Sequence, residues 1–182
     1  MRGFIFGLSL LISSFYALAK TDIVQGPFKL DANDSVYIKK EDDVNYPLAL
    51  YFETNGNSIK VESYEVDGSE PHVETVFFTK INNKKNVIVL ISWEQRHSAE
   101  KINGTAYQVY GYNYSLNSLS INPSIKKDQN LNGLNGEFNG EELHFKYKNA
   151  AEIKTYLQSH YKYFRKALVR LVKLKTHPAQ RI

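Results

Sequence analysis

Apolar and polar residues alternate with a period of two along much of the chain between residues 35 and 122. Segment 35–40 has apolar Val36 and Ile38, and segment 58–66 alternates Ile59 and Val61 with Lys60 and Glu62, which predicts strands with one buried face. Segments 47–53 and 86–93 are almost wholly apolar, a pattern typical of strands covered on both faces. We therefore expect a strand-rich domain with 86–93 as its central strand.

Turn signals separate these segments. Asn55-Gly56 predicts a type I′ hairpin, because both central residues of that turn need a positive φ. Further turns are predicted at 67–71 and 82–85. Pro123 lacks an amide hydrogen, so the last strand of the series is expected at an edge or to end there. The predicted up-and-down unit consists of strands 72–81, 86–93, 104–114 and 118–122.

Two polar stretches predict loops. Residues 94–103 (EQRHSAEKIN) form the first, and the Asn- and Gly-rich residues 126–142 form the second. Leu143, Phe145 and Tyr147 alternate with polar residues after the second loop. Residues 142–148 are therefore predicted to return to the sheet as a strand.

Apolar residues recur at steps of three and four near the C-terminus, which predicts an amphipathic helix of about 25 residues. Asn149 is a good N-cap, and Glu152 stands in the capping-box position three residues later. Pro178 marks the expected end. The apolar stripe consists of Ile153, Leu157, His160, Phe164, Leu168 and Leu171.

These elements together predict an α+β fold. We expect an antiparallel β-meander sheet of about six to eight strands, with the long amphipathic C-terminal helix packed on one face. No segment repeats at a fixed period, so the four-stranded unit is not expected to be one blade of a propeller.

The first residues of the chain predict a targeting segment. Arg2 precedes an apolar run at 4–12, and Ala17-Leu18-Ala19 follows the small-x-small cleavage pattern. We expect residues 1–19 to be a cleaved secretory signal peptide and 20–182 to form a single globular domain. No later stretch is long and apolar enough to cross a bilayer, so no integral membrane segment is expected after cleavage.

Composition places the chain in an exported bacterial class. The chain has no cysteine, which excludes disulfides, a lipid-anchored cysteine, thiolate metal sites and thiol nucleophiles. Abundant Lys, Asn and Ile indicate a bacterial source. The periplasm is the expected location, with secretion into the medium as the second choice.

Charge is distributed unevenly. Residues 20–75 contain five Lys and twelve acidic residues, whereas residues 76–182 contain seventeen Lys or Arg and seven acidic residues. Two interpretations remain open: the two halves attract each other across the fold, or one face meets a charged partner.

Tyrosines are concentrated in the predicted strand 104–114. In an extended chain Tyr110, Tyr112 and Tyr114 project to one face. An exposed row of three rings would form a protein-binding strip. The other interpretation is that the helix or a loop covers the row, and Gly111, which allows close approach, fits both.

A second candidate contact region adjoins Trp93, which is expected to close the central strand. Glu94, Arg96 and His97 follow it in the predicted loop, and loops carry binding residues more often than scaffolds do. Glu94 and His97 could in principle serve as acid and base. The predicted binding residues are Trp93, Glu94, Arg96, His97, Tyr110, Tyr112 and Tyr114.

Motifs for catalysis are missing. The sequence has no G-x-S-x-G, no H-E-x-x-H and no phosphate-binding glycine loop, and its five histidines are scattered. We therefore expect no catalytic residues, no metal and no cofactor. A basic helix could bind nucleic acid or an anionic membrane surface, but an exported protein meets little nucleic acid.

In size, export signal and lack of cysteine and catalytic groups, the chain is similar to periplasmic immunity proteins. That likeness rests on no specific motif and assigns no residue roles. The sequence predicts an exported, non-catalytic protein-binding module, an immunity or inhibitor protein against a toxin or wall-degrading enzyme. The alternatives are a cell-envelope hydrolase, a carbohydrate-binding accessory protein, and a peripheral membrane protein that uses its basic helix.

Overall fold

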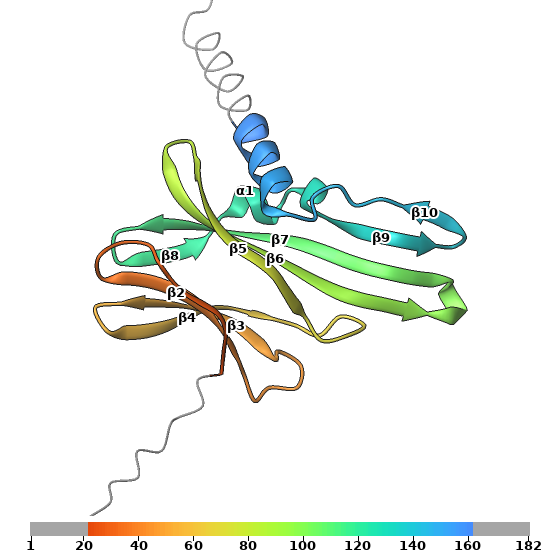
Figure 1. The fold of residues 1–182 in the computed structure, drawn as a ribbon, viewed down its shortest axis with the longest axis horizontal. Helices are drawn as coiled ribbons and strands as arrows, with labels where there is room; N and C mark the ends of the chain where they lie inside the picture. The colour runs from red at the N-terminus through yellow and green to blue at the C-terminus, as the bar shows by residue number, and fades with distance from the viewer. Residues whose placement is uncertain (1–21, 162–182) are drawn as a thin grey trace, which may run out of the picture.

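The computed structural model describes residues 22–161 as two stacked antiparallel sheets with a C-terminal helix on the outer face of the larger one (Figure 1). The small sheet has the order β1-β2-β3-β4, and the large sheet has the order β10-β9-β7-β6-β5, with β8 also paired to β7. The small-sheet strands are β1 (Ile23–Lys29), β2 (Asp34–Lys40), β3 (Leu48–Thr54) and β4 (Asn57–Tyr64). The large-sheet strands are β5 (His72–Ile81), β6 (Lys84–His97), β7 (Ile102–Ser115), β8 (Ser118–Ile121), β9 (Asn132–Phe138) and β10 (Glu141–Leu143).

The prediction of an α+β fold with antiparallel strands is confirmed, with β-structure dominant, but the single meander sheet is wrong. After β4 the chain passes through residues 65–71 and starts a second sheet instead of continuing the first. Alternation shows that a strand has a buried face, but it does not show whether a helix or another sheet buries it.

The predicted turn between β3 and β4 is confirmed, whereas strand β1 was not predicted. Asn55 has φ 49° and Gly56 has φ 77°, as the type I′ turn between β3 and β4 requires. Strand β1 was not anticipated, because Gly26 and Pro27 interrupt its pattern. Gly26 has φ 96°, and a Cβ there would lie 2.8 Å from the Val36 carbonyl oxygen, so this strand passes very close to β2.

Both predicted loops contain strand. Residues 94–103 continue β6 and β7, joined by the short 3-10 helix η1 (Ser98–Glu100). Glu94, Arg96 and Asn103 lie on the solvated face of this antiparallel hairpin, where polar residues do not interrupt pairing. Residues 126–142 contain η2 (Gln129–Leu131), β9 and the start of β10.

The segment after β8 leaves the sheet and returns to the same edge of β7. Helix α1 (Pro123–Lys126) begins at Pro123, where the strand was expected to end. β8 pairs with 112–115 of β7, and β9 pairs with 102–108. The predicted strand 142–148 is wrong beyond Leu143. Phe145 is no longer part of the strand, and its side chain, which is 7% exposed, packs on the face of the large sheet that the helix covers.

Two hydrophobic cores lie on opposite faces of the large sheet. Between the sheets the core consists of Leu30, Val36, Ile38, Leu48, Leu50, Phe52, Tyr64, Val73, Val87, Val89, Ile91, Trp93 and Tyr112. Beneath the helix it consists of Ile81, Ile88, Leu90, Val109, Ile125, Leu131, Ile153 and Leu157. The strand 86–93 contributes to both, which confirms its prediction as a central strand buried on both faces.

The described part of the C-terminal helix spans residues 150–161. Asn149 Oδ1 accepts from the Glu152 amide at 3.0 Å, and Asn149 Nδ2 donates to Glu152 Oε2 at 2.8 Å, which confirms the cap. Ile153 and Leu157 are fully buried, whereas His160 is exposed. The remaining predicted stripe residues, Phe164, Leu168 and Leu171, lie outside the described residues.

Gly111 provides space for the second core. A Cβ at this position would lie 2.2 Å from Ile125 Cδ1 and 3.0 Å from Ile125 Cβ. We expect Gly111→Val to lower the free energy of unfolding by about 1–3 kcal/mol, because the core cannot accommodate added methyl groups. Urea denaturation of Gly111→Val combined with Ile125→Ala tests the cause, because the double variant should recover part of the loss.

Asp34 joins the two sheets through a buried carboxylate. It is 2% exposed, and it accepts from Thr54 Oγ1 at 2.7 Å, Tyr114 OH at 2.7 Å and the Asn117 amide at 3.1 Å. The hydrogen bond from Thr54, with those from Tyr114 and Asn117, lowers the pKa of Asp34 below its ordinary value despite desolvation. These contacts favour the ionised form in the folded state.

The lowered pKa of Asp34 predicts acid-dependent stability. As the pH falls below about 4, the unfolded chain takes up this proton before the folded chain does, so stability decreases. We expect the stability advantage of the wild type over Asp34→Asn to shrink between pH 6 and pH 3, measured by urea denaturation. Asp42→Asn, at an exposed carboxylate, controls for the change in net charge, and a pH-independent difference for Asp34→Asn would contradict the prediction.

Candidate functional site

The tyrosine row lies between the two sheets. Tyr112 is fully buried, and Tyr110 and Tyr114 are half-buried against the same core. The ring of Tyr110 meets that of Tyr64 edge-on at 4.9 Å, and the ring of Tyr114 meets that of Phe52 at 6.3 Å. The small sheet, and not the helix, therefore covers this row.

The hydroxyl groups of Tyr112 and Tyr114 bind acidic residues of the small sheet, whereas Tyr110 OH donates to Gln108 Oε1 of its own strand. Tyr112 OH donates to Glu62 Oε2 at 2.6 Å and lies 3.0 Å from Tyr64 OH. Burial raises the pKa of Tyr112 well above its ordinary value. Burial, with the hydrogen bond to Asp34, raises the pKa of Tyr114 to about 12. These phenols stay protonated at neutral pH and serve as donors between the sheets.

Trp93 and Gln95 anchor the connection between the sheets. Trp93 is 4% exposed, and its Nε1 donates to the Glu65 carbonyl oxygen at 2.9 Å. Gln95 Nε2 donates to the Asp67 carbonyl oxygen at 2.7 Å. We call residues 65–71 the acidic loop, because its charged residues are all carboxylates. The two side chains hold this loop against the large sheet.

Glu94, Arg96 and His97 lie near the end of β6 without forming an acid–base pair. Glu94 and Arg96 face the same side, with Arg96 Nη2 3.4 Å from Glu94 Oε2, and their side chains are 71% and 78% exposed. His97 is also exposed, but strand alternation places it on the opposite face. The hairpin therefore does not bring Glu94 and His97 together.

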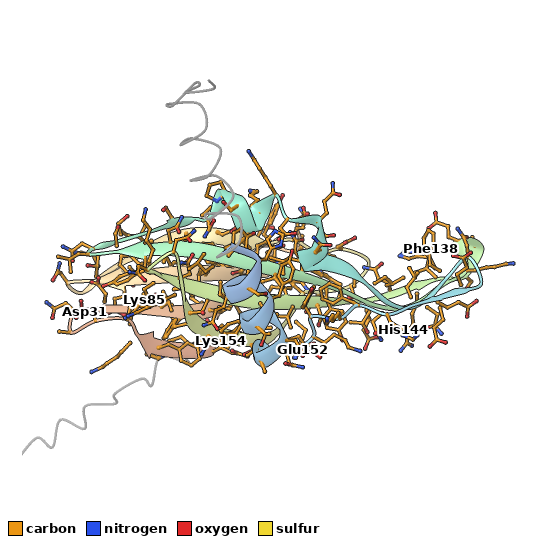
Figure 2. All side chains as sticks on the ribbon, turned by 90° about the horizontal axis from the view of Figure 1, so that it is seen from above. Asp31, Lys85, Phe138, His144, Glu152 and Lys154 are labelled. Carbon is orange, nitrogen blue, oxygen red and sulfur yellow. The ribbon has the colours of Figure 1, made fainter. Side chains whose placement is uncertain are left out.

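The end of the large sheet projects as an arm, which we define as residues 94–105 and 133–143. It consists of the β6–β7 hairpin end, β9 and β10, and Figure 1 shows it extending past β3 and β4. Figure 2 shows Phe138 and His144 near one end of the molecule, with Asp31 and Lys85 near the other. The arm is therefore a surface that the small sheet leaves accessible.

Apolar side chains collect on the face of the arm that continues the inter-sheet face. Ile102 pairs with Phe138, and Leu143 pairs with Gly136, so these residues share that face with Leu134. Phe138 is 41% exposed and Leu143 is 37% exposed. None of the four apolar residues belongs to either core cluster. The opposite face of the arm is polar, with Glu94, Arg96, Asn103, Asn135, Glu137 and Glu142.

Two paired glycines leave the centre of the arm without side chains. Gly104 pairs with Gly136, and a Cβ on Gly136 would lie 2.5 Å from both the Asn103 carbonyl oxygen and Gly104 Cα. Gly136 also has φ 142°, a conformation that other residues rarely adopt. Gly136 belongs to the Asn- and Gly-rich residues 126–142, whose composition predicts a loop although the segment forms β9.

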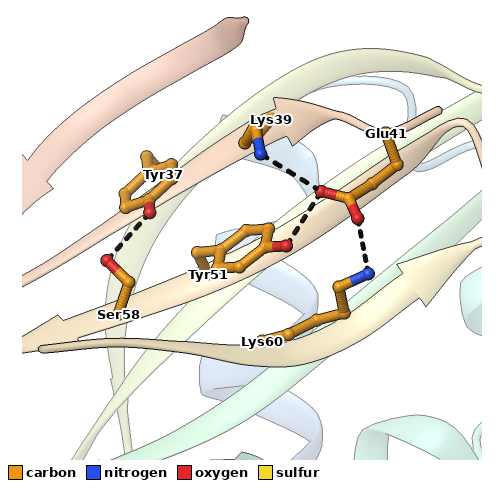
Figure 3. Close-up of polar contacts among 6 residues, drawn as sticks. All are labelled: Tyr37, Lys39, Glu41, Tyr51, Ser58 and Lys60. Atoms are coloured by element: carbon orange, nitrogen blue, oxygen red, sulfur yellow. Dashed lines mark hydrogen bonds and ion pairs between the residues drawn. The ribbon is translucent and has the colours of Figure 1, made fainter. Parts of the chain in front are cut away.

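A second feature that the sequence analysis missed is a polar group on the outer face of the small sheet (Figure 3). Tyr37 and Tyr51 stack with centroids 5.3 Å apart, and Tyr51 OH donates to Glu41 Oε1 at 2.8 Å. Lys60 Nζ lies 2.6 Å from Glu41 Oε2, and Lys39 Nζ lies 3.8 Å from Glu41 Oε1. The hydrogen bond from Lys60 lowers the pKa of Glu41.

A shallow hollow of about 600 Å³ adjoins this group and is lined by Asp22, Lys39, Lys40, Glu41, Asp42, Asp43, Val44 and Lys60. The ring of Tyr51 has Tyr37 on one side, and Lys60 Nζ lies 5.9 Å from its centroid. The carboxylate of Glu41 already accepts hydrogen bonds from Tyr51 and Lys60 and forms an ion pair with Lys39. This arrangement satisfies its own charges and stabilises the strand pairing.

A third group of rings connects the large sheet to the helix. Successive contacts run through Tyr107, Phe145, Tyr147, Tyr156, His160 and Tyr161. Asp128 accepts from Tyr156 OH at 2.8 Å and from Tyr161 OH at 3.2 Å. The rings pack mainly on one another, so they hold the helix on the sheet.

Within residues 22–161 no three His, Asp or Glu side chains gather closely enough to hold a metal ion. Over the same residues, no helix combines the length and the apolar character needed to cross a membrane. The three ion pairs of the described part are Lys39–Glu41, Lys60–Glu41 and Arg96–Glu94. None of these pairs joins the acidic N-terminal half to the basic C-terminal half.

No protein-family model, no curated protein and no solved structure matches the chain. Its function is therefore inferred from its residues and their arrangement. Of the four apolar residues of the arm, Phe138 and Leu143 are exposed and Ile102 and Leu134 are half-buried, and among residues 22–161 none of the four belongs to a core cluster.

Proposed function

We propose that this chain is an exported, non-catalytic protein-binding module that contacts its partner through the apolar face of the arm. An immunity or inhibitor protein, directed against a toxin or a wall-degrading enzyme, is the functional class that we favour. The observation that carries the proposal is the apolar face of the arm, on which Phe138 and Leu143 are exposed and Ile102 and Leu134 are half-buried outside both core clusters. The periplasm is the proposed site of action, on the basis of the N-terminal residues.

The energetics of an antiparallel sheet support this contact role. One face of such a sheet packs on a core, and the other is solvated, so an apolar face without cover costs free energy in water. Exposed apolar residues grouped within a polar rim are typical of protein–protein contact sites. The Gly104–Gly136 pair has no side chains, which allows a partner backbone or ring to approach closely.

The alternative of a hydrolase or a carbohydrate-binding accessory has less support. Glu94 and His97 face opposite sides of β6, so they cannot act on one substrate group from their strand positions. The stacked ring of Tyr51 is occupied by Tyr37 and approached by Lys60, which leaves little free face for a sugar. The tyrosine row between the sheets is likewise occupied by protein.

Substitution at Phe138 tests the proposal. We expect Phe138→Asp to reduce partner capture from envelope extracts at least tenfold, because a carboxylate would be buried without a counter-ion in the contact. Ile59→Asp is the matched control, since Ile59 is a 52% exposed apolar strand residue on β4, away from the arm. Both variants should keep wild-type Tm, because exposed substitutions change stability little.

A genetic readout accompanies the capture experiment. Cells that produce the chain should survive the captured toxin or wall-degrading enzyme, and cells that produce Phe138→Asp should lose that protection. Cells that produce Ile59→Asp should keep it. Equal capture and equal protection by all three proteins would exclude the arm as the contact surface.

A further inference from the structure

We infer that the partner surface which meets the arm presents an apolar side chain surrounded by Lys or Arg residues. This inference rests on the proposed function. The partner class that fits is a basic exported protein, such as a basic toxin or wall-degrading enzyme. Its apolar side chain would pack on Phe138, Ile102 and Leu143, and its Lys or Arg side chains would meet the acidic loop.

The acidic loop borders the apolar face of the arm. Gln95 lies on that face and donates to the Asp67 carbonyl oxygen, and the backbone at Gly68 packs directly against the Gln95 side chain. Glu65, Asp67 and Glu70 are all exposed. Residues 61–79 contain five carboxylates and no Lys or Arg, so no neighbour within this segment neutralises the loop.

A further carboxylate lies beyond the apolar residues. Glu141 on β10 pairs with Phe138 and therefore shares its face. His97 pairs with Ile102 and shares this face, and the other basic residues of the arm are Arg96 and Lys101. Arg96 is paired with Glu94 on the polar face, and Lys101 lies at the hairpin turn. The apolar face is thus flanked by negative charge at the acidic loop and at β10.

Flanking charge of one sign determines which partner can dock. An acidic partner would be repelled, and a basic one would be steered onto the arm at low ionic strength. Because these carboxylates are exposed, their contribution should fall as salt screens them, whereas the apolar contact should persist. The salt dependence of binding therefore measures the contribution of the carboxylates, and substitution of an apolar residue measures the contribution of the apolar contact.

Site-specific photo-cross-linking separates the two parts. The full chain, produced in its own cells with p-benzoylphenylalanine in place of Phe138, should yield a cross-linked adduct with a basic protein. We expect adduct yield to fall about fivefold or more when salt rises from roughly 0.05 to 0.5 M. The adduct yield of the combined variant Glu65→Gln, Asp67→Asn and Glu70→Gln should be lower than that of the wild type by a similar factor. Glu137→Gln with Glu142→Gln, on the polar face of the arm, should leave the yield unchanged.

The outcomes distinguish the inference from the function on which it rests. An adduct that is insensitive to salt and to the acidic-loop variant, or one with an acidic protein, would overturn the charge inference and leave the arm as the contact surface. The full chain with p-benzoylphenylalanine in place of Ile59 is the control and should yield no adduct. If the chain with p-benzoylphenylalanine at position 138 also yields none, the proposed contact through the arm is excluded.

Discussion

Tyr112→Ala is expected to lower the free energy of unfolding by about 3–5 kcal/mol, because a fully buried aromatic side chain is removed from between two sheets. The cavity would open beside Tyr64, which belongs to the facing sheet and cannot collapse into the space without moving its strand. Urea denaturation monitored by the fluorescence of Trp93, in the same core, measures the change.

Tyr112→Phe separates the hydroxyl from the ring. It retains the packing but removes the donor to Glu62, which lies 2.6 Å away, and leaves Tyr64 OH without this partner. The expected loss is about 1–3 kcal/mol, the cost of leaving buried polar groups unpaired. Tyr46→Ala, at a tyrosine that is 42% exposed, should change stability by less than about 0.5 kcal/mol. If Tyr112→Ala were as mild as Tyr46→Ala, the two sheets could not share one core.

The tyrosine row also shows what sequence alone can establish. Period-two alternation placed Tyr110, Tyr112 and Tyr114 on one face, and the structure agrees. The identity of the covering layer could not be predicted, because the residues that bury the row come from strands about fifty positions earlier. Periodicity reports burial along one element and contains no information about distant partners.

Local signals with a specific stereochemical cause were the most reliable. The positive φ values at Asn55 and Gly56 and the reciprocal contacts of Asn149 and Glu152 depend only on neighbouring residues. The arm was missed for the opposite reason. Its glycines look like loop residues in sequence, and only the neighbouring strand shows that Gly136 is required for close pairing with Gly104.

The candidate site could therefore be predicted only in part. Glu94, Arg96 and His97, which follow the predicted central strand, do lie on the arm. The apolar residues that distinguish the arm come from β7, β9 and β10, and their common face exists only once these strands pair. A contact surface assembled across three strands has no signature in any one of them.

Gly136→Ala is expected to have the second large effect, a local loss of strand pairing in the arm. A Cβ would clash at 2.5 Å with backbone atoms of the neighbouring strand, and these atoms cannot turn away as a flexible side chain can. Added strain at φ 142° brings the expected cost to about 2–4 kcal/mol. Because β9 lies next to the short edge strand β10, the strain should be released by opening β9 and not by global unfolding.

Gly140→Ala is the matched control for Gly136→Ala, since Gly140 also has a positive φ, 85°, but has no atom within 4 Å of an added Cβ. It should cost only about 1 kcal/mol. Hydrogen exchange should show faster exchange for 132–138 and 102–108 in Gly136→Ala, with 86–91 still protected. Partner capture should fall together with that protection, because the apolar face of the arm exists only while β7 and β9 are paired. Unchanged exchange in β9, or capture that survives its loss, would mean that the paired strands of the arm are not what the partner recognises.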